Sequence, residues 1–562
     1  MAEVSDIERL LRRHSSMKQE RASWMPHWQE LSTYLLPRNG RYFLQDRDRG
    51  QRKHNNIYDS TGTRALRTLA AGLMSGLTSP ARPWFRLGVA DQDLMKSQPV
   101  KVWLNEVRDL MLAIFAKSNT YLALHSIYGD LGCFGTSASL LLDDFENVIT
   151  HYTSPNGEFC LGTDYRGNVN ALSREFQKTV GELVGEFGYD NCSQTVRGLY
   201  DNSQYNGWVS VVHVVEPRDQ RDASKQDGRN KKFASCYFEM GRDRENQFLS
   251  ESGTDSFRAL APRWEKLSGD VYGMSPAMEA LGDVKQLQHE QLRKANAIDY
   301  QTKPPLQVPT ALKNRNVDQL PGGITYVDSA TPSQQIRTAF DVNLNLQYLL
   351  EDIQDVRGRI NSAFYADLFL MISQLPANGQ MTATEVAERN EEKMLMLGPV
   401  LERLQGELLN PLVELTFERM VKTNILPPPP PELQGVDIQV DFISILAQAQ
   451  KAISTSGVDR FVQSIGVVAQ MKPDVLDKFD SDNWADAYSD MLGVDPDLIV
   501  AGDQVAQVRQ ARAQAQAQAA HNAQANQVAD TAQKGASAIT ALAGAGVAPQ
   551  DVMSGLSGYS GS

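Results

Sequence analysis

Apolar residues recur every three or four positions in three long stretches between residues 271 and 426, with polar residues filling the gaps. The first stretch begins at Ser275 and Pro276, a capping serine followed by proline at the first helical position. Pro304 and Pro305 end it. Its apolar stripe is narrow and consists of Met278, Leu281, Val284, Leu287, Leu292, Ala295 and Ile298. The pattern predicts a mostly polar helix about 37–40 Å long.

A second stretch, residues 341–364, has the same spacing and nearly the same length. Its stripe consists of Leu346, Leu349, Leu350, Ile353, Val356, Ile360 and Phe364. Because a compact insertion joins two helices of equal length, we expect an antiparallel pair. Such thin stripes bury little surface by themselves, so the pair gains more from neighbouring pairs than from its own contact. An ordinary helical hairpin in a soluble enzyme fits the periodicity equally well.

The third stretch, residues 382–426, has the clearest start signal in the chain. Thr382 and Glu385 have the spacing of a capping box, in which each side chain binds the backbone N–H of the other residue. Gly398-Pro399 and Asn410-Pro411 interrupt the helical pattern. Proline removes a helical hydrogen bond, so we expect a kink at each of these dipeptides.

The N-terminal part of the chain is predicted to supply further helices. Residues 5–36 are expected to form one helix, with Trp24 and Trp28 in the core. Asp59 or Ser60 is the expected cap of a second helix with Ala65, Leu69, Leu73 and Leu77 along one side. Glycines at positions 72 and 76 of that helix would allow a neighbouring backbone to approach closely.

Mixed structure is expected for the middle of the chain and helical structure for its end. Residues 100–130 are predicted to form two helices, residues 135–145 a buried strand, and residues 148–240 short strands with one helix, TVGELVGEFG. Five prolines at 427–431 predict a stiff spacer. A small helical bundle is expected over residues 437–500. The Ala/Gln-rich stretch that follows Gly502 is strongly helix-prone but has almost no apolar stripe.

Composition narrows the class of protein. Hydrophobic residues make up 41% and charged residues 22% of the 562, which is typical of globular proteins. A net charge of −13 argues against tight binding to nucleic acid, which requires clusters of Lys and Arg. The four cysteines form no C-x-x-C pair, and no apolar run approaches the ~20 residues that cross a bilayer. With no signal peptide at the N-terminus, we expect synthesis under cytoplasm-like conditions.

Searches for catalytic motifs assign no catalytic, cofactor-binding or metal-binding residue. The sequence contains neither a P-loop nor a G-x-S-x-G elbow, and Arg293 replaces the second histidine of an H-E-x-x-H motif at His289. Asp143, Asp144 and Glu146 could hold Mg²⁺ in a nucleic-acid enzyme. Adjacent acids at the end of a strand are more often a solvated turn, which is the interpretation we prefer.

Taken in order, several blocks resemble the head-to-tail connector, or portal protein, of short-tailed bacteriophages. They include RASWMPHWQELSTYLLP, YDSTGTRALRTLAAGLMSGLTSPARPWFRL, YGDLGCFGTSASLLL, VYGMSPAMEALGDVKQL and QMTATEVAERNEEKM. The resemblance covers roughly residues 5–500 and leaves out the Ala/Gln-rich tail. It implies a mainly helical α+β subunit that forms a homo-oligomeric ring of about twelve copies, a dodecamer, at one capsid vertex.

The resemblance also implies a division of the chain into regions. They are a wing (1–270), a first stem helix (271–299), a clip (300–335), a second stem helix (336–366), a tunnel loop (367–381), a long kinked channel helix (382–426), a Pro-rich linker (427–436), a crown (437–501) and a helical or disordered tail (502–562).

Three groups of site residues follow from these regions. The tunnel loop facing the channel is Ser373, Gln374, Leu375, Pro376, Ala377, Asn378, Gly379 and Gln380. The acidic lining of the channel, which repels DNA at close range, is Glu385, Glu388, Glu391 and Glu392. The clip contacts are Lys313, Asn314, Arg315 and Asn316.

The function implied by the resemblance is a non-enzymatic channel in the virion for packaging and ejecting double-stranded DNA. The implied partners are the terminase large subunit, the major capsid protein, the scaffolding protein and the tail adaptor and tail tube proteins. Two alternatives remain: the Mg²⁺-dependent nucleic-acid enzyme described above, and a scaffold-like or coat-like structural protein without a channel.

Overall fold

The computed structural model describes most of the chain and divides it into two compact units. The described residues are 6–42, 55–91, 94–225, 227–241, 248–303, 305–308, 337–338, 347–373, 391–433, 435–436, 438–443, 461–462, 464–469, 472, 474, 479–484, 500 and 502–544. One unit spans residues 1–91 and 103–467, and the other spans 92–102 and 468–562. Helices and sheets together make a mixed α+β, mainly helical protein, as predicted.

The first predicted helix is two helices, α1 (Asp6–Ala22) and α2 (Met25–Tyr34), so the expectation of one helix over residues 5–36 was wrong. The break falls just before Pro26, whose missing N–H is harmless only in the first turn of a helix. Trp28 is fully buried, as predicted, and its indole N–H donates to the carbonyl of Phe134, 3.1 Å away.

Helices α3 (Thr61–Leu77) and α5 (Thr120–Phe134) pack against each other in the larger unit, whereas α4 (Gln98–Lys117) begins in the smaller unit and continues into the larger one. The four apolar residues predicted for one side of α3 are all buried. At Gly72 a Cβ atom would lie 2.1 Å from the ring of Phe369. The glycine therefore makes room for the aromatic side chain of Phe369, and not for the neighbouring backbone that we expected.

Two antiparallel sheets form the strand-rich part of this unit. The five-stranded sheet has the order β4-β5-β6-β7-β8, and the three-stranded sheet has the order β3-β2-β9. The strands are β2 (Ala138–Asp144), β3 (Val148–Ser154), β4 (Phe159–Thr163), β5 (Val169–Thr179), β6 (Trp208–Pro217), β7 (Phe233–Glu239), β8 (Ser250–Thr254) and β9 (Ala259–Leu260). Helix α1 covers the larger sheet, where Ile7 and Leu10 pack on Val212 and Val214.

The region 148–240 contains the predicted helix and one that the periodicity missed. Helix α6 (Val180–Phe187) begins with a full capping box between Thr179 and Glu182. Helix α7 (Gln194–Asp201) was not predicted, because its eight residues are too few for a clear period. Within the described residues, short 3₁₀ turns lie at Leu94–Lys96, Tyr189–Asn191, Gly228–Asn230 and Pro431–Leu433.

The segment after the proline run is not helical at its start, which corrects the helical bundle expected from residue 437. Ile438–Phe442 form strand β12, which pairs antiparallel with β1 (Phe85–Val89). The alternation of Ile438, Val440 and Phe442 with polar residues is the period of a strand, and we overlooked it. Helical residues within 461–469 agree with the later part of the prediction, whereas residues 444–460 lie outside the described residues.

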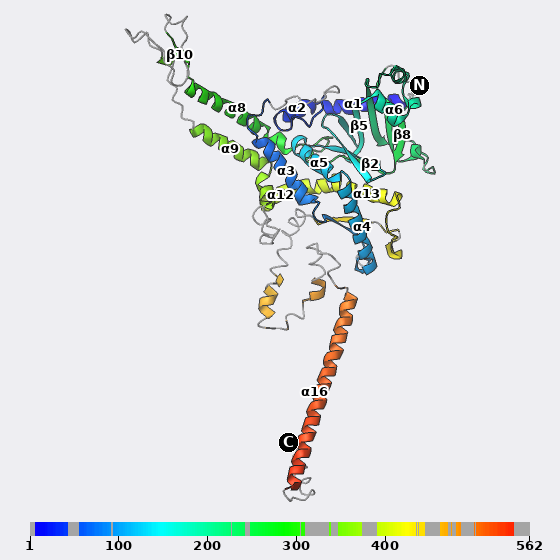
Figure 1. The fold of residues 1–562 in the computed structure, drawn as a ribbon, viewed down its shortest axis with the longest axis vertical. Helices are drawn as coiled ribbons and strands as arrows, with labels where there is room; N and C mark the ends of the chain where they lie inside the picture. The colour runs from blue at the N-terminus through cyan, green and yellow to red at the C-terminus, as the bar shows by residue number, and fades with distance from the viewer. Residues whose placement is uncertain are drawn as a thin grey trace. The chain divides into compact units, whose positions relative to one another are not determined.

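The predicted helix pair is present as α8 (Pro276–Thr302) and α9 (Gln347–Ala363), which lie side by side in Figure 1. Beyond them, β10 (Leu306–Gln307) pairs antiparallel with β11 (Arg337–Thr338), so the two helices run in opposite directions. Helix α10 (Ala366–Ser373) follows α9 directly. We call α8, α9 and α10 the stem.

The long third helix is α12 (Glu391–Leu404), a π-helical turn (Gln405–Leu409) and α13 (Asn410–Lys422). The α-helix continues through Pro399, where we had expected a kink. The predicted interruption at Asn410-Pro411 is confirmed as the π turn that immediately precedes it. The predicted cap, Thr382 with Glu385, lies outside the described residues.

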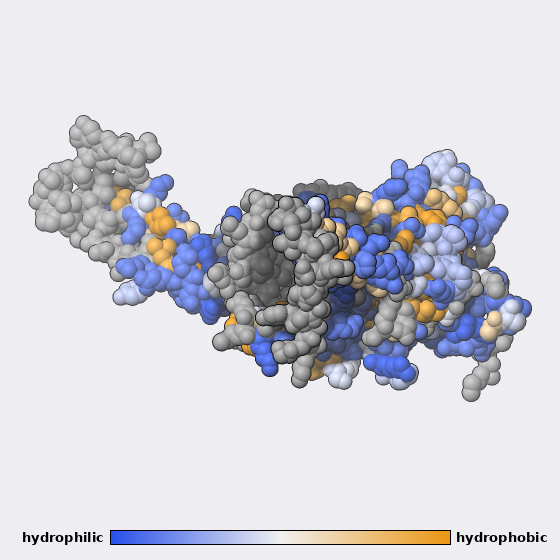
Figure 2. Space-filling model, turned by 90° about the horizontal axis from the view of Figure 1, so that it is seen from below, coloured by the Kyte–Doolittle hydropathy of each residue, from blue (hydrophilic) through white to orange (hydrophobic). Residues whose placement is uncertain are grey.

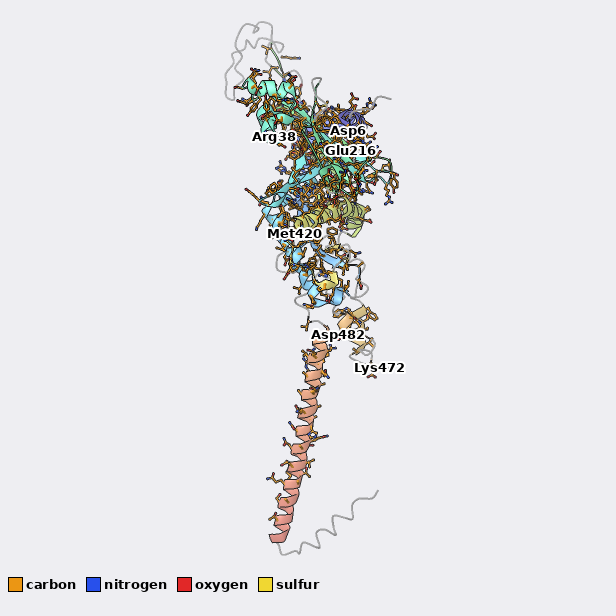
Figure 3. The ribbon with its side chains drawn as sticks, turned by 90° about the vertical axis from the view of Figure 1, so that its right-hand side faces the viewer. Asp6, Arg38, Glu216, Met420, Lys472 and Asp482 are labelled. Carbon is orange, nitrogen blue, oxygen red and sulfur yellow. The ribbon has the colours of Figure 1, made fainter. Side chains whose placement is uncertain are left out.

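The smaller unit contains α16 (Gly502–Gly544), a helix of 43 residues and therefore about 65 Å long. The described side chains of α16 point into solvent around the helix (Figure 3). Helix-prone composition thus produced a helix with no apolar face. Among the described helices of both units, none is long and apolar enough to cross a membrane.

Candidate functional site

The first half of α8 is anchored in the body of the larger unit. The Ser275 hydroxyl accepts from the Met278 N–H at 3.1 Å and donates to the Cys133 carbonyl, so the predicted cap also ties α8 to α5. Val284 and Leu287 are fully buried. The stripe is therefore part of the hydrophobic core as far as residue 290.

The second half of α8 has the same stripe but no core beneath it. Leu292 is 38% exposed and Ile298 is 41% exposed, and on α9 Leu350 is 42% exposed. Figure 2 shows apolar patches among hydrophilic residues on the helices that project from the body. This half of the stem therefore presents apolar side chains that no described residue of the same chain covers.

Asp59 joins the stem to α3 and was not singled out beyond its possible role as a cap. Its carboxylate accepts from the Thr61 N–H and hydroxyl, from Gln291, and from two guanidinium nitrogens of Arg357, the closer at 2.7 Å. Gln288 on α8 binds the backbone of residues 58 and 59. Burial opposes ionisation, but the bonds from Thr61 and Arg357 outweigh it and lower the pKa of Asp59.

Between the two stem helices, one contact attracts and another repels. Arg359 on α9 pairs with Asp283 on α8 at 3.3 Å. One to two turns further out, Glu290 on α8 faces Asp352 on α9. Burial raises the pKa of Glu290, and the nearby Asp352 carboxylate raises it further. The nearby carboxylate therefore disfavours the ionised form of Glu290 at this point of the pair.

The long helix is fixed to the body by a partly buried ion pair. Arg263 is 1% exposed and binds both carboxylate oxygens of Glu407, at 2.6 and 3.1 Å. The same guanidinium donates to the carbonyls of Gly167 and Val271, so it contacts the turn before β5 and the segment leading into the stem. Glu407 lies within the π turn, a rare element that often marks functional positions.

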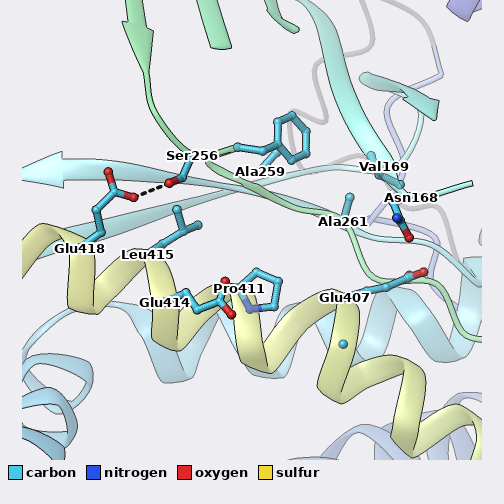
Figure 4. Close-up of a pocket in the computed structure, with 12 residues that line it drawn as sticks. Asn168, Val169, Ser256, Ala259, Ala261, Glu407, Pro411, Glu414, Leu415 and Glu418 are labelled. Atoms are coloured by element: carbon cyan, nitrogen blue, oxygen red, sulfur yellow. Dashed lines mark hydrogen bonds between the residues drawn. The ribbon is translucent and has the colours of Figure 1, made fainter. Parts of the chain in front are cut away.

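Further ion pairs hold the far end of α13. Arg419 and Arg258 both pair with Asp143, at 3.4 and 3.0 Å, and Glu418 accepts a bond from the Ser256 hydroxyl at 2.5 Å. A cavity of about 390 Å³ lies between this end and Glu407. In Figure 4 it is flanked by Ser256, Ala259 and Ala261 on one side and by Pro411, Glu414 and Leu415 on the other. Burial raises the pKa of Glu414 at its edge.

The sequence of the whole chain decides the family. The model of the bacteriophage head to tail connecting proteins matches residues 8–500. The chain belongs to this family. A probable portal protein of Bordetella phage BPP-1 is 59% identical over 559 residues, which cover all of both chains. The portal protein of Salmonella phage epsilon15 is 45% identical over 559 residues, covering 98% of this chain and all of its own.

Among solved structures, the virion of a native gene transfer agent particle contains a similar chain. It shares 10% identity, covers 73% of this chain and 86% of its own, and gives a TM-score of 0.34. A likeness of this size supports no further inference.

The acidic residues considered for Mg²⁺ are engaged otherwise in this connector. Asp143 is occupied by its two arginines, and Asp144 accepts from the Glu146 N–H and the Asn147 amide in the β2–β3 turn. The described residues contain no group of three side chains placed to hold a metal ion. The solvated-turn interpretation fits these contacts, with the addition that Asp143 anchors α13.

The site residues expected from the resemblance fall mostly outside the described residues. These are the tunnel-loop positions 374–380, Glu385, Glu388 and the four clip residues 313–316. The backbone of Ser373 ends α10, and the backbones of Glu391 and Glu392 begin α12. For all of them the role that the resemblance implies stays a prediction.

The sequence did not predict the contacts that anchor the stem and the long helix to the body. Asp59 was noticed as a cap, but its distant partner Arg357 leaves no local signal in the chain. Arg263 and Glu407 are 144 residues apart. Only the Asn410-Pro411 dipeptide pointed toward this place, because proline disturbs the helical turn before it.

Proposed function

We propose that this protein is a portal: a structural, non-enzymatic subunit that assembles with copies of itself into a ring at the junction of phage head and tail. Family membership over residues 8–500 carries the proposal. It is supported by the outer half of α8, whose apolar stripe is left exposed at Leu292 and Ile298. In a ring these side chains pack against the stem of the neighbouring subunit.

Double-stranded DNA passes through the axial opening of this ring during packaging and ejection. The net charge of −13 suits a surface that DNA must slide past without binding. Glu385, Glu388, Glu391 and Glu392 line the channel, and residues 373–380 form the tunnel loop that contacts DNA sterically, because they contain no Lys or Arg.

Each of the remaining regions has its own role or partners. The clip (300–335), with Lys313, Asn314, Arg315 and Asn316, docks the terminase large subunit during packaging and the tail adaptor and tail tube proteins afterwards. The wing (1–270) meets the major capsid protein and the scaffolding protein, and the crown (437–501) lies inside the capsid. The protein is made in the host cytoplasm and becomes part of the virion, with twelve subunits as the expected ring.

Electron microscopy of the purified full chain tests the ring directly. We expect closed rings with an axial opening wide enough for duplex DNA. A chain that remains monomeric or dimeric at micromolar concentration in native mass spectrometry contradicts the proposal. The nuclease alternative would instead show divalent-dependent cleavage of DNA, and a coat-like protein would assemble without an axial hole.

A second experiment tests the tunnel loop alone. Replacing residues 373–380 with a short glycine linker should leave ring assembly intact and impair the packaging or retention of DNA in capsids. Mutant capsids that package and retain full-length DNA like the wild type would remove the channel role from this loop without affecting the ring.

A further inference from the structure

The outer halves of the two stem helices carry opposite charges. Residues 291–303, the outer half of α8 with its C-cap, contain three bases and one acid, so their net charge is +2. Residues 347–356, the outer half of α9, contain three acids and no base, so their net charge is −3. The bases are Arg293, Lys294 and Lys303, and the acids of α9 are Glu351, Asp352 and Asp355. All of these side chains are exposed except that of Lys294, which is half-buried.

Charges nearer the body are paired within the chain, whereas these are not. Three bases of the inner stem each pair with an acid of the same chain: Lys285 with Glu30, Arg357 with Asp59 and Arg359 with Asp283. Within the described part of the chain, Arg293 and Lys294 form no ion pair. The carboxylate of Glu351 accepts a bond from Gln347 of its own helix. The outer half thus combines uncovered apolar side chains with unmatched charges, and both call for a partner outside the chain.

The register of the helix pair places two exposed leucines at the same level. The two contacts between α8 and α9 described above lie seven residues apart on each helix, so the pair is in antiparallel register. Leu292 lies two residues beyond Glu290, and Leu350 lies two residues beyond Asp352, which faces Glu290. The leucines therefore lie equally far out along the stem, and they are 38% and 42% exposed.

The same two leucines lie on opposite flanks of the pair. Successive residues of a helix are turned by about 100°, so residues two positions apart are turned by about 200°. Because Glu290 and Asp352 face each other, Leu292 and Leu350 face away from each other. A single chain therefore cannot bring these leucines into contact.

One charged residue accompanies each leucine on its flank. Arg293 follows Leu292, and Glu351 follows Leu350, each by one position and about 100° in the same sense. Since the helices are antiparallel, these two turns lead to the same side of the pair. One flank of the stem thus presents a leucine beside a base, and the opposite flank presents a leucine beside an acid at nearly the same level.

The two flanks are complementary only between different copies of the chain. A rotation about an axis parallel to the stem keeps each residue at its level and brings the α8 flank of one copy against the α9 flank of the next. Repeated contacts of this head-to-tail kind close into a ring. A two-fold contact of α8 with α8 would instead bring the bases of two copies together, and like charges repel.

We infer that the outer half of α8 in one subunit packs against the outer half of α9 in the next. Leu292 then contacts Leu350 of the neighbouring subunit, and Arg293 lies beside Glu351 of the neighbouring subunit. The inference rests on the proposed function, because it names the surfaces that join the ring. It adds a direction to the assembly: each subunit uses one flank of its stem toward one neighbour and the other flank toward the other.

Charge reversal on each flank tests the pairing. Arg293→Glu and Glu351→Arg each place like charges across every contact of the ring. Each should raise the concentration needed for half-maximal assembly at least about threefold, as native mass spectrometry over a concentration series can measure. Arg512→Glu is the matched control, because it makes the same exchange at an exposed position of α16, and it should assemble like the wild type.

Mixing the two variants gives the sharpest readout. In a ring in which they alternate, every contact again joins one base to one acid. An equimolar mixture should therefore assemble at the concentration of the wild type, although neither variant does so alone. With one variant isotopically labelled, the mass of the ring should show equal numbers of both chains. The rescue also requires that both variants are folded, so it excludes misfolding as the cause of the single effects.

The outcomes that contradict the inference differ from those that contradict the ring. Single variants that assemble like the wild type would show that these charges lie outside the contact. Weakened variants whose mixture is not rescued would show that Arg293 and Glu351 are not partners. In both cases the wild-type rings stand and the inference alone fails. A wild type that forms no rings refutes the proposed function together with this contact.

A cysteine pair locates the contact independently of charge. The four native cysteines are buried and unpaired, so they give little background. Rings of the double variant Leu292→Cys with Leu350→Cys should give a ladder of disulfide-linked multimers on mild oxidation, because every contact holds one cysteine of each kind. Leu292→Cys alone should remain unlinked. A linked dimer of this single variant would show α8 meeting α8 and overturn the inference, and so would the absence of a ladder in the double variant.

Discussion

The two halves of α8 share one apolar stripe and end in different environments. Up to Glu290 the stripe is part of the core of the body, and from Gln291 onward it is exposed along with its neighbours on α9. Periodicity is the same in both halves, so it does not tell which half has a partner within the chain. The comparison teaches that the inner half stabilises one subunit, whereas the outer half leaves its apolar side chains exposed for the subunit contact that we propose.

The largest effect is expected from truncating the stripe at one residue in each half. Leu287→Ala leaves a cavity under a fully buried side chain and should lower the free energy of unfolding by about 2–5 kcal/mol. Leu292→Ala changes a partly exposed side chain and should alter the stability of the monomer by less than about 0.5 kcal/mol. Denaturant unfolding under conditions that keep the chain monomeric measures both.

In ring assembly, unlike in monomer stability, the substitution at Leu292 should have the clear effect. A folded Leu292→Ala subunit should form rings less readily than the wild type, which native mass spectrometry can quantify across a concentration series. If Leu292→Ala and the wild type assemble equally well, the outer half of the stripe is not part of a subunit contact.

The next effect concerns the polar anchor of the inner half. Asp59→Ala leaves the Arg357 guanidinium and the Thr61 N–H without their acceptor and should cost about 1–3 kcal/mol. Arg359→Ala breaks the more exposed pair with Asp283, which lies slightly nearer the body on the same helix, and should cost about 0–1 kcal/mol. Similar losses in thermal unfolding would show that the Asp59 anchor contributes no more than an exposed ion pair.

The pH dependence of this anchor has a definite sign. Because the pKa of Asp59 is lowered by folding, its contribution is complete above the unfolded value of about 3.8 and is lost as the pH falls below it. The wild type and Asp59→Ala should therefore converge in stability in strong acid.

A smaller effect of opposite sign is expected at Glu290, where the two halves meet. Its pKa is raised in the folded chain, so the ionised form is destabilising, and stability falls as the pH rises from about 4.5 toward the folded value. Glu290→Gln should stabilise the chain slightly at pH 7 and give no advantage well below pH 4.5. A variant that melts earlier than the wild type at pH 7 would refute the repulsion from Asp352.

The smallest effect is expected from removing the tail. A chain ending at Gly502 lacks nearly all of α16, whose described side chains are exposed, so the midpoint of thermal unfolding of the body should not change. Rings should also still form. Loss of rings by this truncation with a folded body would show that the tail contributes to the subunit contact.

Local signals in the sequence determined where most helices lie and what begins them. Ser275-Pro276 predicted the start of α8 because a capping hydroxyl and a proline act within one turn. The prolines at 304 and 305 predicted its end, and Asn410-Pro411 predicted a disturbed helix. The failures at the break near Pro26 and in β12 fell where a local signal was present, a proline and a two-residue period, but a longer helix was expected. Helix α7 was too short for a clear period.

Contacts between distant residues were decided only by the tertiary structure. Nothing local in the chain links Asp59 to Arg357 or Arg263 to Glu407, because these pairs depend on how complete elements pack. The same holds for Gly72, whose missing side chain is explained only by the ring of Phe369. Short-range hydrogen bonding and periodicity can be read along a chain, whereas the choice of a buried partner is made by the whole fold.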